Sequence, residues 1–352
     1  MTGARPLTIG ARAIGPGRPA YLVAEIGINH NGDLDLARRS IDAAKAAGAD
    51  AVKFQNYRTE DFVSDRALTF TYRSQGRTVT EPQYDMFKRV ELSPEMLRRL
   101  YEHARAAGID FHSTPTSREG VEALVSLGCD VIKNGSDYLG HHELIRFMGG
   151  TGRIVVLSSG MATLAEIDEA VRALRGTGNE KLVLLHCVSS YPAPDEAMNL
   201  RRIPALSAAF DCLVGFSDHS AGITAAQGAV ALGACWIEKH FTLDRDLPGP
   251  DHWFSSDPAE FSRLADGVRA METMLGDARI GPTRAEAEMR DVARLSCVAA
   301  RTLPAGHTLA PADVAYRRPA TGLPPAMAAF LVGRRLKCDV ASGTALRLEW
   351  LE

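Results

Sequence analysis

The sequence of 352 residues lacks long apolar runs, carries little net charge and has no paired cysteines. Its apolar stretches fall well short of the ~20 residues that a membrane-spanning helix needs, so no membrane segment is expected. The formal charge is −3, from 40 basic and 43 acidic residues, and this balance gives no support for binding to nucleic acid or to a membrane surface. The stretch MTGARPLTIGARAIG has no apolar core of the kind found in signal peptides, so we expect a cytoplasmic protein.

The cysteines stand singly, without a CxxC pair: Cys129, Cys187, Cys212, Cys235, Cys297 and Cys338. Several lie inside apolar runs, which is typical of reduced core residues of a cytoplasmic protein, and a catalytic or redox role of one of them is the alternative. Apolar residues make up 45% of the chain and charged residues 24%, as in soluble globular proteins. The length predicts more than one ordinary domain and fewer than three.

Four stretches share one pattern, in which a helix rich in Ala and Leu ends at a Gly and a short apolar run follows. They are KAAGADAVKF (45–54), RAAGIDFHST (105–114), VSLGCDVIKN (125–134) and VALGACWIEK (230–239). Gly is favoured just after a helix because it has no Cβ to oppose the left-handed conformation needed there. Repeated units of this kind predict parallel strands joined by helical crossovers.

Eight strands are predicted, near 21–27, 51–56, 110–114, 131–135, 154–160, 182–188, 213–219 and 235–240. Helical patterns lie between and after them, at 34–47, 95–107, 118–127, 141–148, 164–175, 200–209, 222–232 and 258–275. Eight such units over ~250 residues are typical of a (β/α)₈ TIM barrel. A doubly wound open sheet is the alternative, but no GxGxxG follows the first strand. The connection 57–93 is unusually long, and we interpret it as a lid or binding element.

The composition of the sequence changes after residue 276, where a polar, charged segment begins. We therefore predict a TIM-barrel catalytic domain at 1–276, a charged linker at 277–293 and a small β-rich domain at 294–352. The last segment alternates short apolar runs with Pro and Gly turns and contains no long amphipathic helix. A domain of this size buries little apolar surface in its core, so we expect it to need stabilising contacts from outside itself.

Every predicted barrel strand delivers polar side chains near its carboxyl end, the end where barrel enzymes place their functional groups. These side chains are Glu25, Lys53, Gln55, Ser113, Thr114, Lys133, Ser136, Ser158, Ser159, Ser189, Tyr191, Ser217, His219, Glu238 and His240. An unpaired buried ammonium is costly, although one salt bridge could explain either lysine. Two inward lysines with a ring of hydroxyls predict an anionic ligand, with phosphate or carboxylate fitting best.

His219 and His240 end adjacent strands and can share one divalent ion, with coordination positions left for water and substrate. The alternative is that each histidine is satisfied structurally. Glu238 is interpreted as the structural partner of a lysine, and Lys239 faces the opposite way from its two neighbours. The segment RDLPGPDHWFSSDP either presents Asp251 and His252 on a loop stiffened by Pro-Gly-Pro or forms a simple turn.

Motifs across nearly the whole chain resemble the sialic acid synthase family. They are AEIGINHNG (24–32), KFQ (53–55), STP (113–115), HCVSSYPAP (186–194), GFSDHSAG (215–222), ALGACWIEKHFTLDRDLPGPDH (231–252) and RRP (317–319). The resemblance implies a TIM barrel followed by a SAF (β-clip, antifreeze-like) domain. It also implies a transferase that condenses phosphoenolpyruvate with an N-acetylmannosamine-type sugar, giving a nonulosonic acid and phosphate by metal-assisted C–O cleavage. N,N′-diacetyllegionaminate or pseudaminate synthesis are alternatives, and a metal-dependent barrel aldolase or hydrolase is an alternative of another class.

The resemblance implies a role for each matching residue. His219 and His240 match the ligands of a divalent cation, usually Mn²⁺, with Mg²⁺ or Co²⁺ as alternatives. The positions matching the phosphoenolpyruvate site are Lys53, Thr114, Lys133, Ser136, Ser189 and Ser217. Those around the metal's water and the sugar are Glu25, Gln55, Tyr191 and Asp251, with Glu25 the candidate for handling that water's proton.

Arg318 matches an arginine that reaches from the small domain into the barrel of the other subunit, which implies a domain-swapped homodimer. Two positions depart from the family pattern. In KNGSDY (133–138), Tyr138 stands where a sugar-contacting Glu is common, with Asp137 beside it. Either Asp137 substitutes for that Glu or the sugar differs from N-acetylmannosamine. Ser189 stands where many members have Asn.

Overall fold

The structure, a computed structural model, describes residues 5–352 and divides into two compact units. The first unit ends at Gly276 and the second begins at Asp277. Within residues 5–352, no helix combines the length and the apolar character needed to cross a bilayer.

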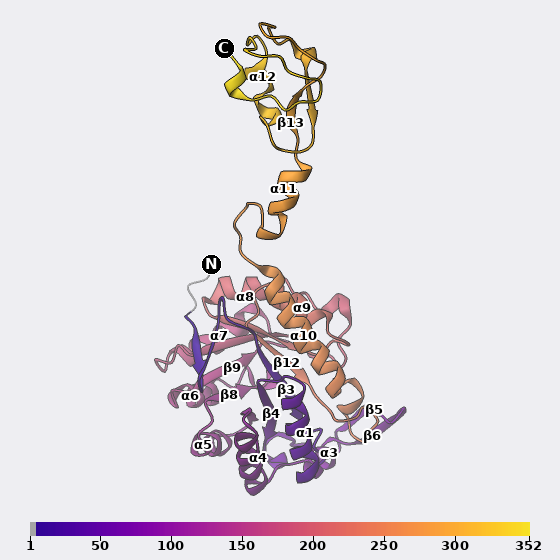
Figure 1. The fold of residues 1–352 in the computed structure, drawn as a ribbon. Coiled ribbons are helices and arrows are strands. Elements are labelled where there is room, and N and C mark those ends of the chain that lie inside the picture. The colour runs from indigo at the N-terminus through magenta and orange to yellow at the C-terminus, as the bar shows by residue number, and fades with distance from the viewer. Residues whose placement is uncertain (1–4) are drawn as a thin grey trace. The chain divides into compact units, whose positions relative to one another are not determined.

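A closed parallel sheet forms the centre of the first unit (Figure 1). Its eight strands are β3 (Tyr21–Gly27), β4 (Ala51–Asn56), β7 (Asp110–Pro115), β8 (Val131–Asn134), β9 (Ile154–Ser158), β10 (Leu182–Cys187), β11 (Leu213–Asp218) and β12 (Trp236–His240). They lie in the order β7-β4-β3-β12-β11-β10-β9-β8, and β7 also packs beside β8. The sheet therefore closes on itself, which confirms the predicted (β/α)₈ barrel.

Helices alternate with these strands along the chain and cover the barrel. They are α1 (Leu34–Ala46), α4 (Pro94–Ala107), α5 (Arg118–Leu127), α6 (His142–Gly150), α7 (Leu164–Arg175), α8 (Arg202–Phe210), α9 (Thr224–Ala231) and α10 (Pro258–Leu275). Asp33 caps α1 by accepting hydrogen bonds from the amides of Asp35 and Leu36. Gly108 ends α4 with a φ of 71°, the left-handed conformation that its lack of a Cβ permits.

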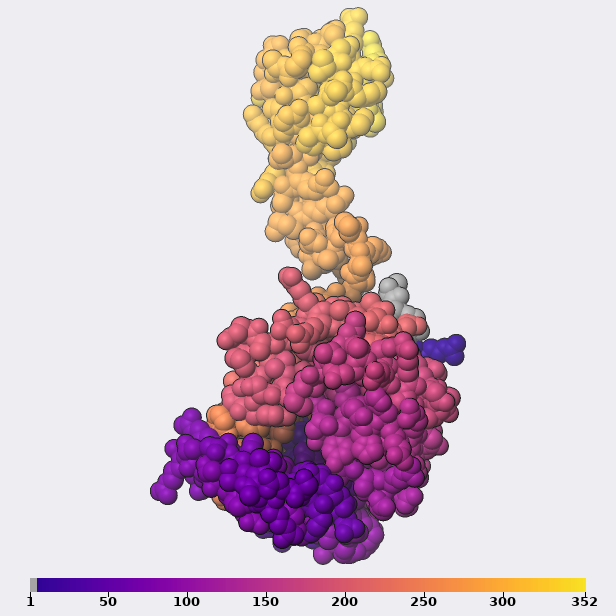
Figure 2. All heavy atoms as spheres, turned by 180° about the vertical axis from the view of Figure 1, so that it is seen from behind, coloured from indigo at the N-terminus to yellow at the C-terminus, as the bar shows by residue number. Residues whose placement is uncertain are grey.

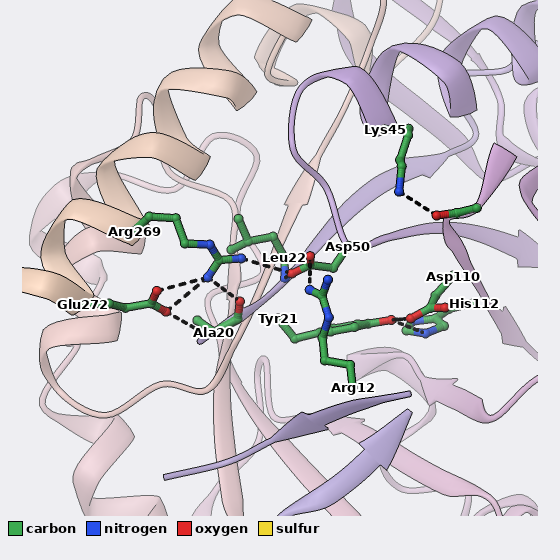
Figure 3. A network of polar contacts seen from close by, with 11 residues as sticks. Arg12, Ala20, Tyr21, Leu22, Lys45, Asp50, Asp110, His112, Arg269 and Glu272 are labelled. Atoms are coloured by element: carbon green, nitrogen blue, oxygen red, sulfur yellow. Dashed lines mark hydrogen bonds and ion pairs between the residues drawn. The ribbon is translucent and has the colours of Figure 1, made fainter. Parts of the chain in front are cut away.

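A short antiparallel hairpin, β1 (Leu7–Ile9) and β2 (Arg12–Ile14), closes the amino-terminal end of the barrel. Its Ile9 and Ile14 are buried with side chains of the barrel interior. Arg12 pairs with Asp50, and Tyr21 donates a hydrogen bond of 2.7 Å from Oη to Asp110 (Figure 3). This hairpin was not predicted, and it leaves the carboxyl ends of the strands as the open end of the barrel.

The long connection after β4 folds into helices and a second hairpin. It contains α2 (Thr59–Phe62), β5 (Thr69–Ser74), β6 (Arg77–Pro82) and α3 (Gln83–Arg89). The turn between the two strands is Gln75-Gly76, with φ values of 50° and 73°. Two positive φ values are typical of a type I′ turn, whose twist matches the twist of the flanking strands.

The second unit has its own core, built around Cys297, Leu303, Leu309 and Leu346. Its regular elements are α11 (Ala287–Ala293), β13 (Ser296–Ala299), β14 (Val314–Arg317) and α12 (Ala328–Leu331). Strands β13 and β14 pair in antiparallel fashion, and isolated bridges such as that between Leu303 and Val340 extend the β structure. The predicted small β-rich domain is therefore present, and the linker segment carries the short helix α11.

Candidate active site

A cavity of about 660 Å³ opens at the carboxyl ends of the barrel strands. Sixteen residues singled out in the sequence line it: Glu25, Lys53, Gln55, Thr114, Lys133, Ser136, Asp137, Tyr138, Ser158, Ser189, Tyr191, Ser217, His219, Glu238, His240 and Asp251. Figure 2 shows the cavity as a hollow in this face of the first unit, with the purple segment that includes β5 and β6 along one side. The barrel thus brings together side chains that are more than two hundred positions apart in the sequence, from Glu25 to Asp251.

Two lysines and two carboxylates form a buried cluster at the base of the cavity. The Nζ atom of Lys53 lies 2.8 Å from Oε2 of Glu25 and donates a hydrogen bond of 3.0 Å to Oγ1 of Thr114. Lys133 donates a hydrogen bond of 2.8 Å to Oε1 of Glu238, and this oxygen lies 3.6 Å from Nζ of Lys53. All four charged side chains are at most 4% exposed. Their formal charges cancel, which is how the barrel tolerates them away from water.

The neighbouring charges in this cluster shift the pKa values of its members and keep Glu238 and Lys53 ionised. Burial opposes ionisation of Glu238, but Lys133 and Lys53 outweigh it and lower the pKa of this carboxyl to about 2. Burial also opposes the charge of Lys53, yet Glu238 and Glu25 raise the pKa of its ammonium. For Glu25, burial dominates and raises the pKa above the ordinary value despite Lys53. Glu25 is therefore the carboxyl of the cluster best suited to accept a proton.

Small side chains converge beside the cluster. Ser136 Oγ accepts a hydrogen bond of 3.1 Å from the amide of Gly160. A Cβ at Gly160 would lie 2.3 Å from Oγ of Ser189 and 2.6 Å from Oγ of Ser136, so only glycine fits between the two hydroxyls. Ser217 Oγ lies 3.4 Å from Oε1 of Glu238. Hydroxyl and ammonium donors thus surround one end of the cavity, an arrangement suited to phosphate or carboxylate oxygens.

His219 and His240 lie next to each other at the cavity wall, with ring centroids 5.4 Å apart. Nδ1 of His219 lies 2.8 Å from the carbonyl oxygen of Val188. Because a carbonyl only accepts, this nitrogen carries a proton, and Nε2 is the nitrogen that a cation would bind. Nδ1 of His240 is buried and has no hydrogen-bond partner within residues 5–352. Burial and the neighbouring His219 lower the pKa of His240, so this ring is held neutral.

These features fit a divalent cation. Two imidazoles offer lone pairs, and Asp251 places a carboxylate oxygen 3.7 Å from Nδ1 of His240. Over residues 5–352, no group of three or more His, Cys, Asp or Glu side chains is arranged as a metal-binding set. An ion held by His219 and His240 would therefore complete its coordination with water and substrate oxygens, as catalytic sites with open positions do.

The outer part of the cavity is largely aromatic and apolar. Its walls include Ile28, Tyr57, Phe62, Phe70, Tyr72, Met86, Phe87, Tyr138, Met161, Trp253 and Phe254. Tyr138 and Asp137 both reach the cavity from a 3₁₀ turn at Ser136–Tyr138. On the polar side, Gln55 donates a hydrogen bond of 3.1 Å to Oε1 of Glu25, and the ring of Tyr191 lies 4.3 Å from that of His219. The cavity thus has a charged inner half and an apolar outer half.

Comparisons with known proteins identify the family of this chain. The profile of the NeuB family matches residues 40–279, and that of the SAF domain matches residues 296–352. The chain belongs to the NeuB family. The resemblance to sialic acid synthases drawn from the motifs is thereby confirmed.

Relatives of this NeuB-family chain include several named synthases. The N,N′-diacetyllegionaminic acid synthase of Legionella pneumophila is 36% identical over 347 residues, which cover 97% of this chain and 98% of that protein. The N-acetylneuraminate-9-phosphate synthase of Mus musculus is 34% identical and covers 85% and 83%. The crystal structure of the N-acetylneuraminic acid synthetase from Leptospira borgpetersenii, in complex with citrate, has a TM-score of 0.74 at 33% identity and covers 81% and 95%.

Some side chains at the strand ends do not line the cavity. Ser113 donates a hydrogen bond of 2.6 Å to Asn56, and Ser159 donates one of 2.9 Å to the carbonyl of Leu185. Lys239 faces away from the cavity, as predicted, and pairs with Asp218 at 2.8 Å. His252 is buried with its Nδ1 2.7 Å from Oγ1 of Thr242, so it supports the loop that presents Asp251.

Other residues of the site were not singled out from the sequence. Cys187 lines the cavity, with Sγ 3.7 Å from Oγ of Ser136 and 3.8 Å from Nδ1 of His219. Burial opposes its ionisation, but the contact with His219 outweighs burial and lowers the pKa of this thiol to about 6. Interpreting all six cysteines as core residues is therefore incomplete. A signal existed, because Cys187 lies two positions before Ser189 and thus on the same face of the chain.

Arg318 directly follows β14 in the second unit and is exposed. The cavity described above is formed by residues of the first unit. The reach of Arg318 into another subunit, and the homodimer that it implies, stay predictions.

Proposed function

We propose that the chain condenses phosphoenolpyruvate with an open-chain, N-acylated mannose-type sugar to form a nonulosonic acid and phosphate. The observation that carries the proposal is the buried cluster of Lys53, Lys133, Glu25 and Glu238 beside the histidine pair at the barrel mouth. Named relatives that cover nearly the whole chain are synthases of such sugar acids, which supports the same class of reaction here.

The inner half of the cavity suits the phosphate and carboxylate of phosphoenolpyruvate. Lys53 and Lys133 supply positive charge that is already desolvated and held in position by carboxylates. Thr114, Ser136, Ser189 and Ser217 add hydroxyl donors around the same space. Fixed donors of this kind need no reorganisation during the reaction, and such preorganised electrostatics is usually the largest contribution to catalysis.

The proposed reaction begins when C3 of phosphoenolpyruvate attacks the aldehyde carbon of the sugar. The electron pair of the C2–C3 double bond forms the new C–C bond, and C2 gains positive character. Water then adds to C2, and its proton passes to Glu25 and on to the oxygen of the former aldehyde. The C2–O bond to phosphate finally breaks with its electron pair leaving on phosphate, and the hydroxyl on C2 becomes the ketone by giving its proton to the departing phosphate. The raised pKa of Glu25 suits it to this proton transfer.

A divalent cation held by His219 and His240 would polarise the aldehyde oxygen as a Lewis acid. We expect Mn²⁺, with Mg²⁺ or Co²⁺ as alternatives, because nitrogen and oxygen donors suit these ions. Gln55, Tyr191 and Asp251 line the same cavity as the histidines, and there they would orient the sugar.

The outer half of the cavity supports a preference among sugars. Its walls are aromatic, and Tyr138 occupies the position where the resemblance leads one to expect a Glu for sugar hydroxyls. Apolar walls favour acylamino and deoxy substituents over hydroxyls, because a buried hydroxyl without a partner is costly. We therefore propose a sugar with two acylamino groups as the preferred acceptor, in keeping with the named activity of the Legionella relative.

The test is release of phosphate from phosphoenolpyruvate with Mn²⁺ across a panel of N-acylated mannose-type sugars, with and without a chelator. We expect sugar-dependent release that the chelator stops, and a higher kcat/KM for a diacetamido sugar than for N-acetylmannosamine. The proposal would be contradicted if no sugar of the panel supported phosphate release. Trapping of a pyruvate adduct on a lysine by borohydride would instead support a Schiff-base aldolase.

A further inference from the structure

Two segments that are distant in the sequence form adjoining walls of the cavity. The β5–β6 hairpin contributes Phe70, Tyr72 and Arg73, and the segment after β12 contributes Asp251, Trp253 and Phe254. The hairpin follows β4, and β4 and β12 flank β3 on opposite sides in the sheet. Connections from these strands can therefore meet above β3, and Figure 1 shows β5 and β6 at this edge of the barrel.

The turn of the hairpin contacts the second segment through two hydrogen bonds. Ser74 Oγ accepts one of 3.1 Å from the amide of Gly249, and Gln75 donates one of 3.0 Å from Nε2 to the carbonyl of Asp246. The guanidinium of Arg73 lies 5.6 Å from the ring centroid of Trp253, within the range of a cation–π contact. Ser74 is only 7% exposed, although the turn residues after it are exposed.

The backbone of this loop makes the contact with Ser74 specific. In Pro248-Gly249-Pro250 only Gly249 has an amide hydrogen, since proline has none. Gly249 has a φ of 147°, and a Cβ there would lie 2.8 Å from Cδ2 of His252. On the barrel side, Asn31 donates a hydrogen bond of 2.8 Å to the carbonyl of Pro248. The loop is thus held between Asn31 and the hairpin turn.

We infer that Ser74 and Gln75 are positioning residues, which pin the loop that carries Asp251 and so shape the sugar half of the cavity. The substrate assigned to that half rests on the proposed function. Asp251 follows Gly249 by two positions and places a carboxylate oxygen 3.7 Å from Nδ1 of His240. The phosphoenolpyruvate half depends on Lys53, Lys133 and Ser217, which belong to barrel strands and not to the pinned loop. Loss of the contacts therefore affects the sugar and spares phosphoenolpyruvate.

Hydrogen exchange tests the pinning without any substrate. The full chain would carry Ser74→Ala, Gln75→Ala or both, and exchange would be followed in peptides that cover 244–254. We expect about fivefold faster exchange for each hydrogen bond lost, because the net contribution of one such bond is small but measurable. Two controls are matched to these variants. Thr80→Ala removes the exposed contact with Thr71 on the same hairpin, and Ser74→Thr keeps the hydroxyl, so both should exchange like the wild type.

Steady-state kinetics then tests the consequence for the sugar. The double variant should lose about tenfold in kcat/KM for the sugar, as expected for two hydrogen bonds, while the KM for phosphoenolpyruvate stays within twofold. Unchanged exchange in 244–254 of the double variant would overturn the pinning. Equal rises in both KM values would overturn the restriction to the sugar. A wild type that releases no phosphate with any sugar would refute the proposed function, and the exchange measurement would still decide the pinning.

Discussion

Replacement of Glu238 by Gln probes the balance of charge on which the inner half of the cavity depends. Glu238 is 4% exposed and its Oε1 lies 2.8 Å from Nζ of Lys133 and 3.6 Å from Nζ of Lys53. Glutamine keeps the shape and one acceptor but removes the charge, so the cluster changes from neutral to a net charge of +1. Breaking a buried ion pair on one side costs about 3–5 kcal/mol. Because the amide oxygen still accepts a hydrogen bond, we expect about 3 kcal/mol in the free energy of unfolding.

The assay is thermal unfolding in phosphate-free buffer, followed by titration with inorganic phosphate. A loss of ~3 kcal/mol in a domain of this size lowers Tm by about 6–10 °C. Phosphate should bind the variant several-fold more tightly than the wild type, because the anion no longer competes with the carboxylate for the lysines. Phosphate should therefore raise the Tm of the variant more than that of the wild type.

Glu102→Gln is the matched control, since Glu102 forms an exposed pair with Arg98 on α4. Exposed pairs contribute ~0.2–1 kcal/mol, so its Tm should stay close to that of the wild type. An unchanged Tm for Glu238→Gln, or weaker phosphate binding by this variant, would refute the reasoning. The first result would mean that Glu238 does not offset the lysines, and the second that the lysines do not form the anion site.

Three further predictions concern the histidine pair, the small unit and its arginine. His240→Ala should lose Mn²⁺ binding in electron paramagnetic resonance and metal-dependent phosphate release, whereas His103→Ala, which alters an exposed pair with Asp42, should keep both; an unchanged rate in His240→Ala would exclude the metal role. Arg318→Ala should raise the KM for the sugar far more than the KM for phosphoenolpyruvate, and equal effects would count against a reaching arm. Asp313 accepts hydrogen bonds from His307, the amide of Ala310 and Arg301, which lower the pKa of its carboxyl from 3.8 to about 2. The stability from this lowered pKa is present above about pH 4 and lost as pH falls toward 2. Asp313→Asn should thus lower the unfolding free energy at pH 7 by about 1–3 kcal/mol and flatten its dependence on pH between 4 and 2, and an unaltered acid limb in chemical denaturation would disprove this.

The polar side chains that face the cavity from the strand ends could be predicted from the sequence, because successive side chains of a strand point to opposite faces. This period of two places Lys53 with Gln55, Ser217 with His219, and Glu238 with His240 on the same face, and all six line the cavity. The barrel itself followed from the helix–Gly–strand repeats, since parallel neighbours require crossovers. The same period places Cys187 on the face of Ser189, but Cys187 lies in an apolar run and was therefore interpreted as a core residue.

The sequence by itself determined the strands, the helices and the end of the barrel that carries polar groups, because those features depend on residues close together in the chain. The tertiary structure alone decided which charges meet. It brought Glu238 between two lysines more than a hundred positions away and joined Ser74 to Gly249 across 175 positions. It also left Nδ1 of His240 without a hydrogen bond to any residue that the structure describes. It also closed the barrel floor with the β1–β2 hairpin. Such contacts arise only when the barrel closes, so no local pattern of residues encodes them.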